Sequence, residues 1–351
     1  MEPPPPIHIH PPLLNSANPW ATTLEDLKAL FECPSTGAVT TRTSLLAGFA
    51  HDPAAHQYTF FNPSTHAVPA GPVSSTTPPA AGPAGSNGSL NNMGYSPVTL
   101  DEYLGFIREI AAESTKEEKK EKLFIVSVTG SPADVAECYV RIARIAGAVR
   151  TPLAMEINLS CPNIPGAPPP AYDEEALVRY LDAVSRVAAA VAAEGTEGGG
   201  VRVPWGIKTP PYTHAGQFAM LGAALVRAAA ANASPYCPVS FVTATNTLGS
   251  CLVLSPDAAP RLAGPGVGGM AGAPLHPLAL GNVAALRGLL DAAPQTRHVD
   301  VIGVGGVEDA GGFRRMRSVG AAAVGVGTAL GRKGVKVFVE IEEGLGGRWE
   351  G

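Results

Sequence analysis

The chain lacks the features of disulfide-rich, zinc-binding and membrane-spanning proteins. It has five cysteines in 351 residues, at positions 33, 138, 161, 237 and 251, and no two of them form a CxxC pair. An odd number of scattered cysteines argues against a disulfide framework and against a metal site, so no metal is expected and a reducing cytoplasm is the expected compartment. No apolar run of about 20 residues is free of proline and charge, so no membrane span is expected.

The chain also has little charge, 16% of its residues, and a net charge of −5. Nucleic acids and anionic membranes attract basic proteins, so neither is expected as a partner. The amino terminus, MEPPPPIHIHPP, has an acid and a proline run where a secretory signal needs a basic start and an apolar stretch. A small-molecule substrate is the partner that these properties favour.

Short apolar runs alternate with longer amphipathic stretches along the chain. The runs lie near residues 12–17, 37–42, 123–129, 153–159, 203–208, 240–246, 299–304 and 322–327, and helices are predicted over 98–114, 132–146, 174–194, 215–231, 277–292 and 307–319. This alternation is typical of strand and helix units that build a parallel sheet. Composition and length alone allow one large barrel or two domains, but eight such strands predict an α/β fold, the (β/α)8 TIM barrel, over a single domain of residues 1–351.

Most of these runs finish in Asn, Lys, Arg, Thr or Gly. Residues at the carboxyl ends of barrel strands line the reaction face, so the recurrence of polar ends favours an active site there, although each residue alone could be a turn former. Residues 62–89 stand outside the alternation because Pro, Gly, Ser, Thr and Ala dominate them. We expect this segment to be a flexible insertion without a fold of its own.

Three glycine-rich segments occur late in the chain, at 266–272, 303–312 and 325–331. The last two follow the seventh and eighth predicted strands, and the segment at 303–312 runs straight into a helix. Backbone amides there could point at an anion with a helix dipole behind them, in the usual phosphate position of such barrels. A single glycine-rich turn is more often only a tight turn, but two on adjacent strands favour a phosphorylated ligand.

The ligand is better explained as a mononucleotide than as a dinucleotide. A dinucleotide site would need GxGxxG after the first strand, and the chain does not open with such a unit. Flavin mononucleotide (FMN) fits better, because Lys208 at the end of the fifth predicted strand could then stabilise negative charge on the reduced ring. A snorkelling surface lysine is the alternative, but Lys208 closes an apolar strand and precedes a double proline.

Cys161 differs from the other cysteines in its surroundings. It follows an apolar strand in MEINLSCPNIPG, between Asn158 and Asn163. A free cysteine is more often a buried apolar residue, but a thiol beyond a strand end can act as a general base when neighbouring dipoles favour the thiolate. No Ser/His/Asp or Cys/His arrangement is evident, which disfavours covalent hydrolysis.

Several segments are similar to those of one family and follow that family's order over nearly the whole chain. They are SLNNMGY (89–95), NLSCPNIPGAPPPAYD (158–173), GIKTPPY (206–212), TATNTLG (243–249), GGMAG (268–272), VIGVGGV (301–307) and GVGTAL (325–330). The segment at 158–173 is highly specific, and the glycine-rich ones are supportive. On these residues the chain resembles the dihydroorotate dehydrogenases, in particular the soluble class 1A enzymes.

The resemblance implies an FMN barrel that oxidises (S)-dihydroorotate to orotate in pyrimidine biosynthesis. Cys161 would take the proton from C5 while a hydride leaves C6 for flavin N5, with Lys208 and Arg42 as the other catalytic residues. Positions that match the substrate site are Asn91, Met93, Gly94, Tyr95, Asn158, Asn163, Asn246 and Thr247. Positions that match the flavin site are Ala17, Thr43, Ser44, Asn158, Lys208, Thr245, Gly272, Gly305, Gly306, Gly327 and Thr328. Amides suit this substrate because each offers an imide both a donor and an acceptor.

The chain departs from the family's pattern at a few positions. Arg42 stands where lysine is usual, and Tyr95 and Ser96 stand where Leu and Pro are usual. Arginine keeps the charge but not the compact ammonium geometry. A divergent FMN oxidoreductase acting on another cyclic imide or enoate therefore stays open, as does a flavin-binding scaffold without turnover.

The subclass bears on the electron acceptor. Membrane-bound relatives use a serine base and an amino-terminal membrane helix, which this sequence does not show, and the NAD-linked class needs an iron–sulfur partner subunit. The segment PGAPPPAYD (165–173) favours class 1A. For that class the resemblance implies fumarate as acceptor and a homodimer.

Overall fold

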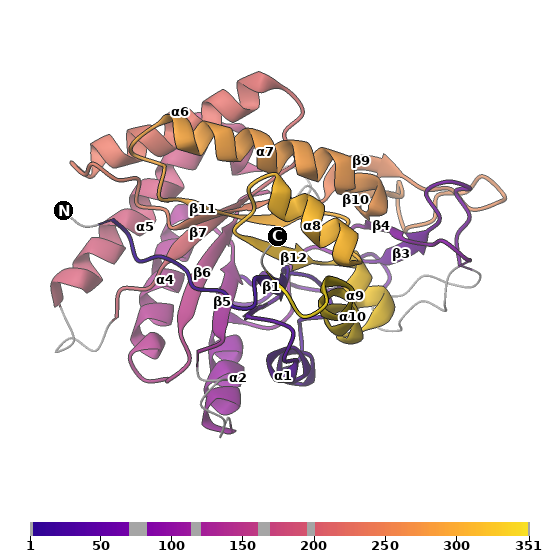
Figure 1. Cartoon of the computed structure of the whole chain (residues 1–351), viewed down its shortest axis with the longest axis horizontal. Helices are drawn as coiled ribbons and strands as arrows, with labels where there is room; N and C mark the ends of the chain where they lie inside the picture. Colours follow the sequence, from indigo (N-terminus) through magenta and orange to yellow (C-terminus); the bar gives the residue numbers. More distant parts are fainter. Residues whose placement is uncertain (1–2, 70–82, 114–120, 161–168, 195–200, 350–351) are drawn as a thin grey trace.

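The computed structural model describes residues 3–69, 83–113, 121–160, 169–194 and 201–349. Its centre is a closed barrel of parallel strands in the order β1-β12-β11-β8-β7-β6-β5-β2 (Figure 1). The strands are β1 (Leu13–Asn15), β2 (Ala38–Thr40), β5 (Leu123–Val128), β6 (Leu153–Asn158), β7 (Trp205–Thr209), β8 (Phe241–Ala244), β11 (Asp300–Val304) and β12 (Ala323–Val326). Each coincides with one of the predicted runs, so the predicted (β/α)8 barrel is confirmed.

Helices follow the strands and cover the outside of the barrel (Figure 1). The predicted ones are present as α2 (Leu100–Glu113), α4 (Pro132–Ala146), α5 (Glu174–Glu194), α6 (Ala215–Ala231), α7 (His276–Ala292) and α8 (Ala310–Ser318). The structure adds α1 (Leu24–Glu32), α9 (Thr328–Lys333), α10 (Lys336–Leu345) and the short 3-10 turns η1 (Pro170–Tyr172) and η3 (Ala273–Leu275). A capping box of Thr23 and Asp26 starts α1, so its amino-terminal signal was legible in the sequence.

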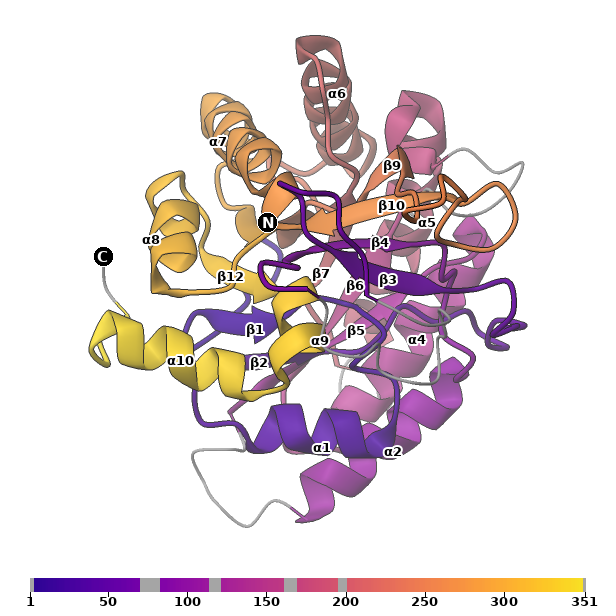
Figure 2. The same cartoon turned by 90° about the vertical axis from the view of Figure 1, so that its right-hand side faces the viewer.

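A second, antiparallel sheet lies at the carboxyl ends of the barrel strands, in the order β3-β4-β10-β9 (Figure 2). Its strands are β3 (Tyr58–Phe61), β4 (Gly88–Asn91), β9 (Leu248–Leu252) and β10 (Val267–Gly272). A Cβ at Gly268 would lie 2.3 Å from the Asn91 carbonyl oxygen, so only glycine lets β10 pair this closely with β4.

The prediction of a flexible insertion over residues 62–89 is wrong for the last two residues, which belong to a strand. Gly88 and Ser89 are buried members of β4, where they pair with both β3 and β10. The pairing partners lie far away in the sequence, so the local composition of the segment did not reveal the strand. Residues 70–82 of the predicted insertion lie outside the described residues.

Side chains alternate along the strands and give the barrel interior two different layers. Leu123, Ile125 and Phe241 belong to an apolar cluster that fills its lower part. Closer to the carboxyl ends of the strands the buried residues are polar, and they include Glu156 on β6 and Lys208 on β7. The apolar layer supports a polar floor beneath the mouth of the barrel.

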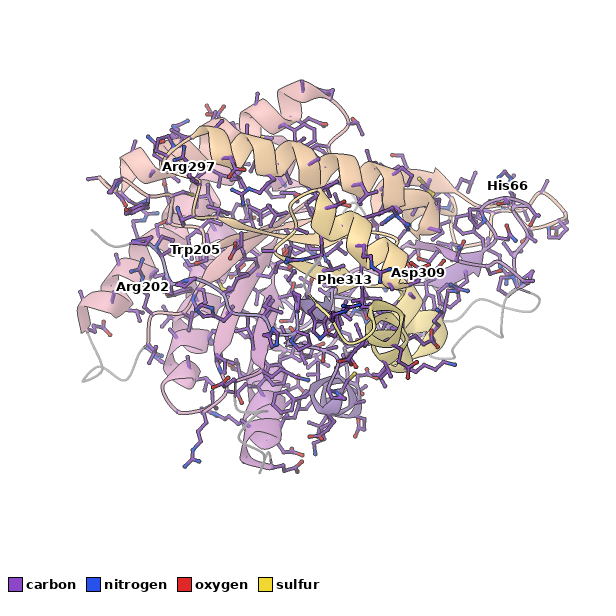
Figure 3. The ribbon with its side chains drawn as sticks, in the orientation of Figure 1. His66, Arg202, Trp205, Arg297, Asp309 and Phe313 are labelled. Carbon is purple, nitrogen blue, oxygen red and sulfur yellow. The ribbon has the colours of Figure 1, made fainter. Side chains whose placement is uncertain are left out.

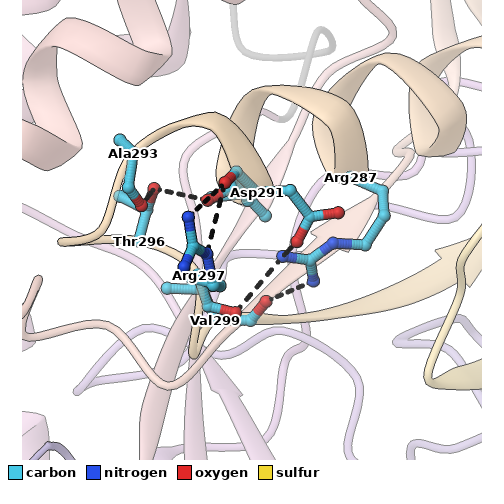
Figure 4. A network of polar contacts seen from close by, with 7 residues as sticks. Arg287, Asp291, Ala293, Thr296, Arg297 and Val299 are labelled. Carbon is cyan, nitrogen blue, oxygen red and sulfur yellow. Dashed lines mark hydrogen bonds and ion pairs between the residues drawn. The ribbon is translucent and has the colours of Figure 1, made fainter.

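At the opposite end of the barrel, hydrogen bonds join α7 to the loop that leads into β11. From α7, Arg287 donates to the Val299 carbonyl over 2.7 Å and to Asp291 Oδ1 over 2.8 Å, and Arg297 in the following loop donates to the Asp291 carbonyl over 3.3 Å (Figure 4). In Figure 3, Arg297 and His66 label opposite ends of the molecule. This network anchors the start of β11. It lies at the end of the barrel opposite the carboxyl ends of the strands, where the active site of such a barrel is expected.

Candidate active site

A pocket opens between the carboxyl ends of the barrel strands and the small sheet. It contains about 1020 Å³ of atom-free space, part of it open to solvent. Such a space is large enough for a cofactor and a small substrate.

The pocket brings together all but one of the predicted site residues that the structure describes. They are Ala17, Arg42, Thr43, Asn91, Met93, Gly94, Tyr95, Asn158, Lys208, Thr245, Asn246, Thr247, Gly272, Gly305, Gly306, Gly327 and Thr328. Ser44 is not among the lining residues; its backbone bonds Ser127 and Thr129 and joins the β2 side of the wall to β5. Cys161 and Asn163 lie outside the described residues.

Strand β7 places Lys208 in the pocket wall beside Asn158 of β6. Lys208 is 3% exposed, and no residue in the described part of the chain forms a hydrogen bond or ion pair with its ammonium group. The Oγ1 of Thr245 is also buried without a partner there. Buried polar groups without partners are costly, so this wall suits a polar, electron-rich ligand.

Glycines form a close-fitting cradle on another side of the pocket. Gly272 and Gly306 have φ of +83° and +69°. A Cβ at Gly272 would lie 2.2 Å from the Asn87 carbonyl oxygen, and one at Gly306 would lie 2.7 Å from the Gly272 carbonyl oxygen. Larger residues would therefore close the cradle. Helix α9 starts directly after Gly327, which provides no side-chain cap.

One part of the phosphate prediction is wrong. Strand β11 ends at Val304, but α8 begins only at Ala310, and Asp309 Oδ1 accepts the Gly312 N–H over 2.7 Å. Figure 3 labels Asp309 at this helix start. A carboxylate already caps the helix, so the α8 dipole is not available for a ligand phosphate. The backbone at Gly305 and Gly306 is what the segment contributes.

A pair of side chains that sequence reasoning did not single out holds this backbone. His276 Nδ1 lies 2.7 Å from the Gly305 carbonyl oxygen, and Arg315 Nε donates to His276 Nε2 over 3.0 Å. Arginine can only donate, so His276 Nε2 accepts and Nδ1 carries the proton that reaches Gly305. The tautomer of His276 and the position of the Gly305 carbonyl are therefore linked.

Carboxamides from two strand ends meet on the floor of the pocket. Asn246 Nδ2 donates to Asn158 Oδ1 over 3.2 Å and to Ser160 Oγ over 3.0 Å. The Thr247 N–H donates to Asn246 Oδ1 over 2.8 Å. The small sheet holds the side chain of Asn91 in place, because Asn91 Nδ2 donates to the Gly269 carbonyl of β10 over 3.1 Å. These amides are fixed before any ligand enters.

Residues 79–348 match the family model described as dihydroorotate dehydrogenase. The chain belongs to the dihydroorotate dehydrogenase family. Dihydroorotate dehydrogenase (fumarate) of Trypanosoma cruzi is 34% identical over 264 residues, which cover 74% of this chain and 72% of that protein. Dihydroorotate dehydrogenase A (fumarate) of Lactococcus lactis subsp. cremoris is 30% identical over 256 residues, 72% of this chain and 71% of that protein.

The match with solved structures supports the fold of this family member. The DHODH of Eimeria tenella in complex with ferulenol superposes with a TM-score of 0.67 at 16% identity, over 95% of this chain and 80% of that one. Membership in the family implies a flavin cofactor. Lys208 and Thr245, whose side chains have no partner among the residues that the structure describes, and the glycine cradle fit a ligand with a polar ring and a phosphate.

The positions that depart from the family pattern are connected in space. Arg42 donates from Nη2 to the Tyr95 carbonyl over 2.9 Å and to the Gly94 carbonyl over 3.4 Å. Ser96 Oγ is 2.8 Å from the Tyr103 hydroxyl. Phe49 packs on the same segment, since a Cβ at Gly94 would lie 2.6 Å from its ring. In this family member, Arg42 therefore supports the backbone at Gly94 and Tyr95.

Two aromatic pocket residues were missing from the sequence prediction. Trp20 and Tyr58 both line the pocket, and their rings meet edge to face with centroids 5.3 Å apart. Burial raises the pKa of Tyr58, and a hydrogen bond with Trp20 opposes the rise. Trp20 follows the first barrel strand closely and could have been suspected. Tyr58 reaches the pocket only through the pairing of β3 with β4.

The described cysteines carry no sign of an activated thiol. Burial raises the pKa of Cys138 and of Cys237 to about 12, and it also raises the pKa of Cys33 and Cys251. A raised pKa makes the thiolate scarce at neutral pH, which agrees with a packing role.

None of the described helices has the length and apolar character needed to cross a bilayer.

Proposed function

We propose that this member of the family oxidises (S)-dihydroorotate to orotate, with FMN as cofactor and fumarate as electron acceptor. The observation that carries the proposal is the convergence of Lys208, the carboxamides and the glycine cradle in one pocket at the mouth of the barrel. The names of the Trypanosoma cruzi and Lactococcus lactis relatives, at 34% and 30% identity, support the substrate and the acceptor.

Different residues of the pocket would bind the phosphate and the ring of the cofactor. FMN, when bound, supplies the acceptor for the hydride that leaves C6 of the substrate. We assign the phosphate to the cradle of Gly272, Gly305 and Gly306 and to Gly327 at the start of α9, where backbone N–H groups are close and side chains are absent. Lys208 supplies a fixed positive charge that offsets negative charge on the ring.

The substrate lies between the carboxamides and the segment from Met93 to Tyr95. Asn91, Asn158 and Asn246 offer donors and acceptors to the pyrimidine edge, with Thr247 beside them. The resemblance to the family implies a substrate contact for Asn163 as well. Cys161 takes the proton from C5 as the C6–H bond breaks, so the substrate loses one proton and one hydride and gains a C5–C6 double bond. In the sequence Cys161 directly follows Ser160, whose side chain bonds both pocket amides.

The finer assignments have their own tests. Fumarate would accept the two electrons taken from the substrate, together with two protons, and leave as succinate. Sedimentation of the purified protein tests the homodimer that class 1A membership implies, and a monomer at micromolar concentration would contradict it. The scattered cysteines favour a reducing compartment, the cytoplasm, as the place of this reaction.

Anaerobic mixing with dihydroorotate tests the reaction. The purified protein should be yellow, and dihydroorotate should bleach the flavin band. Cys161→Ala should slow the bleaching by on the order of a hundredfold or more, as expected for loss of a general base. Cys251→Ala, at a cysteine outside the pocket lining, is the matched control and should reduce at the wild-type rate. Unchanged reduction in Cys161→Ala would refute the base assignment.

A second candidate rests on the contact of Arg42 with the backbone at Gly94 and Tyr95. Both hydrogen bonds come from Arg42 Nη2, and the flat guanidinium differs in length and shape from the ammonium of the lysine usual at this position, so the substrate wall differs from the family's pattern. The chain would then oxidise another cyclic imide, or reduce an enoate. Yellow protein that dihydroorotate does not bleach, but that a related imide does, would favour this candidate.

A further inference from the structure

A chain of hydrogen bonds runs through the barrel interior from Glu156 to the pocket. Glu156 lies on β6 and is 2% exposed. Ser127 Oγ donates to Glu156 Oε1 over 2.8 Å, and Ser127 Oγ and Thr43 Oγ1 are 2.9 Å apart. Asn158 Nδ2 then donates to Thr43 Oγ1 over 3.0 Å. The chain therefore connects a buried carboxylate to a side chain of the pocket floor.

The chemistry of Glu156 fixes the direction of every bond in this chain. Glu156 Oε1 accepts the hydroxyl proton of Ser127, and a hydroxyl has only one proton to donate. Ser127 Oγ must then accept the hydroxyl proton of Thr43. Thr43 Oγ1 has only acceptor capacity left for its third partner, so Asn158 turns its NH2 group toward Thr43.

The other side of the Asn158 amide requires the same orientation. The backbone N–H of Ser160, which can only donate, bonds Asn158 Oδ1 over 3.2 Å, and the Ser160 hydroxyl donates to the same oxygen over 3.0 Å. Asn246 Nδ2 spends both of its hydrogens on Asn158 Oδ1 and Ser160 Oγ. The groups left for a ligand are the second N–H of Asn158 and a lone pair on Asn246 Oδ1.

We propose that Glu156 is a positioning residue, which acts through Ser127 and Thr43 to hold Asn158 as a donor and Asn246 as an acceptor toward the substrate. The inference rests on the proposed function, because the edge of a cyclic imide presents a carbonyl next to an N–H and matches this pair. Glu156 is not among the residues that line the pocket, so we infer that it acts on the ligand through the orientation of the amides.

Two replacements of Glu156 distinguish its role as a hydrogen-bond acceptor from the effect of its charge. Glu156→Met removes the acceptor, so the Ser127 and Thr43 hydroxyls can reverse and compete with the Asn158 NH2 group. We expect the Kd of orotate, measured from its shift of the flavin absorbance, to rise about tenfold, as for the loss of one hydrogen bond. Glu156→Gln keeps an acceptor oxygen and should stay within about threefold of wild type. An equal rise in both variants would overturn the proposal.

A double-mutant cycle tests whether Glu156 acts through Asn158. With Asn158→Ala in place, Glu156→Met should change the orotate Kd by less than about twofold, because the amide that it orients is gone. If the two substitutions instead multiplied their effects on the orotate Kd, Glu156 would act independently of Asn158 and the proposal would be refuted. Thr243→Val is the matched control, since it removes a buried hydroxyl that has no partner among the described residues, and it should bind orotate like wild type.

Failure of the proposed function can be recognised separately. Flavin-loaded wild-type protein without any spectral response to orotate would reject the substrate. Crystal structures then decide the role of Glu156: in Glu156→Met the contact between Asn246 Nδ2 and Asn158 Oδ1, 3.2 Å in the wild type, should break. An intact contact would contradict the proposal. If Glu156→Met does not retain flavin, Ser127→Ala interrupts the same chain one step later and should give the same results.

Discussion

Two buried lysines of the barrel give opposite predictions for stability. Lys208 is 3% exposed, and its ammonium has no partner among the residues that the structure describes. Lys122, directly before β5, is 8% exposed and donates to the carbonyls of Phe31 and Cys33 over 2.8 and 2.6 Å and to Thr36 Oγ1 over 3.0 Å. Within the described part of the chain, nothing compensates the charge of Lys208, whereas the ammonium of Lys122 has three hydrogen-bond acceptors.

The size of each effect follows from these contacts. An unpaired buried ion costs several kcal/mol, and water in the open pocket lowers that cost, so Lys208→Met should raise the free energy of unfolding of flavin-free protein by about 2 kcal/mol. Lys122→Met leaves three acceptors without this donor. Each unsatisfied group costs about 1–3 kcal/mol and the costs do not add fully, so we expect a loss of about 4 kcal/mol.

Urea unfolding of the flavin-stripped proteins, followed by circular dichroism at pH 7, measures both changes. With excess FMN the order of Lys208→Met and wild type should reverse, because the ligand stabilises the protein that binds it more tightly. A loss of stability in flavin-free Lys208→Met as large as that in Lys122→Met would refute the reasoning, because it would mean that the Lys208 charge is already compensated in the empty pocket.

Other predictions concern the phosphate side, the cysteines and alkaline stability. His276→Ala removes the donor to the Gly305 carbonyl, so the Kd of FMN in equilibrium dialysis should rise about tenfold; unchanged retention would contradict the supporting role. Cys138 and Cys237 have pKa values raised to about 12 and should react with a thiol reagent at pH 8 only after unfolding, which rapid labelling of the native protein would disprove. Burial raises the pKa of Tyr103 to about 12 against about 10 in the unfolded chain, so its contribution to stability should be lost between these pH values. Tyr103→Phe should remove that part of the pH dependence, and an identical alkaline profile would count against it.

The sequence was most informative where structure is local. The predicted strands are short apolar runs, most of which end in polar residues or glycine, and each predicted run contains or overlaps one observed strand. The helices between them show their own periodicity, so the barrel and the position of its mouth were predictable. The strand-end residues Asn158 and Lys208 lie in the pocket because alternate side chains of a barrel strand face its interior.

The small sheet was not predictable in the same way. Strand β4 pairs with β10, so Leu90 lies opposite Met270, and neither segment has a clear alternating pattern. A strand rich in glycine is stabilised by partners distant in the sequence rather than by its own propensity. This is also why Tyr58, which arrives on β3, was not expected in the pocket.

By itself, then, the sequence determined the barrel, its polar rim and the family to which the chain belongs, because periodicity, strand ends and motifs are properties of neighbouring residues. Only the tertiary structure decided that Asp309 caps α8, that Ser44 stands behind the pocket wall, and that Glu156 is joined to Asn158. The physical reason is that a hydrogen bond depends on distance and direction in space, and residues far apart in the chain acquire these only when the barrel closes.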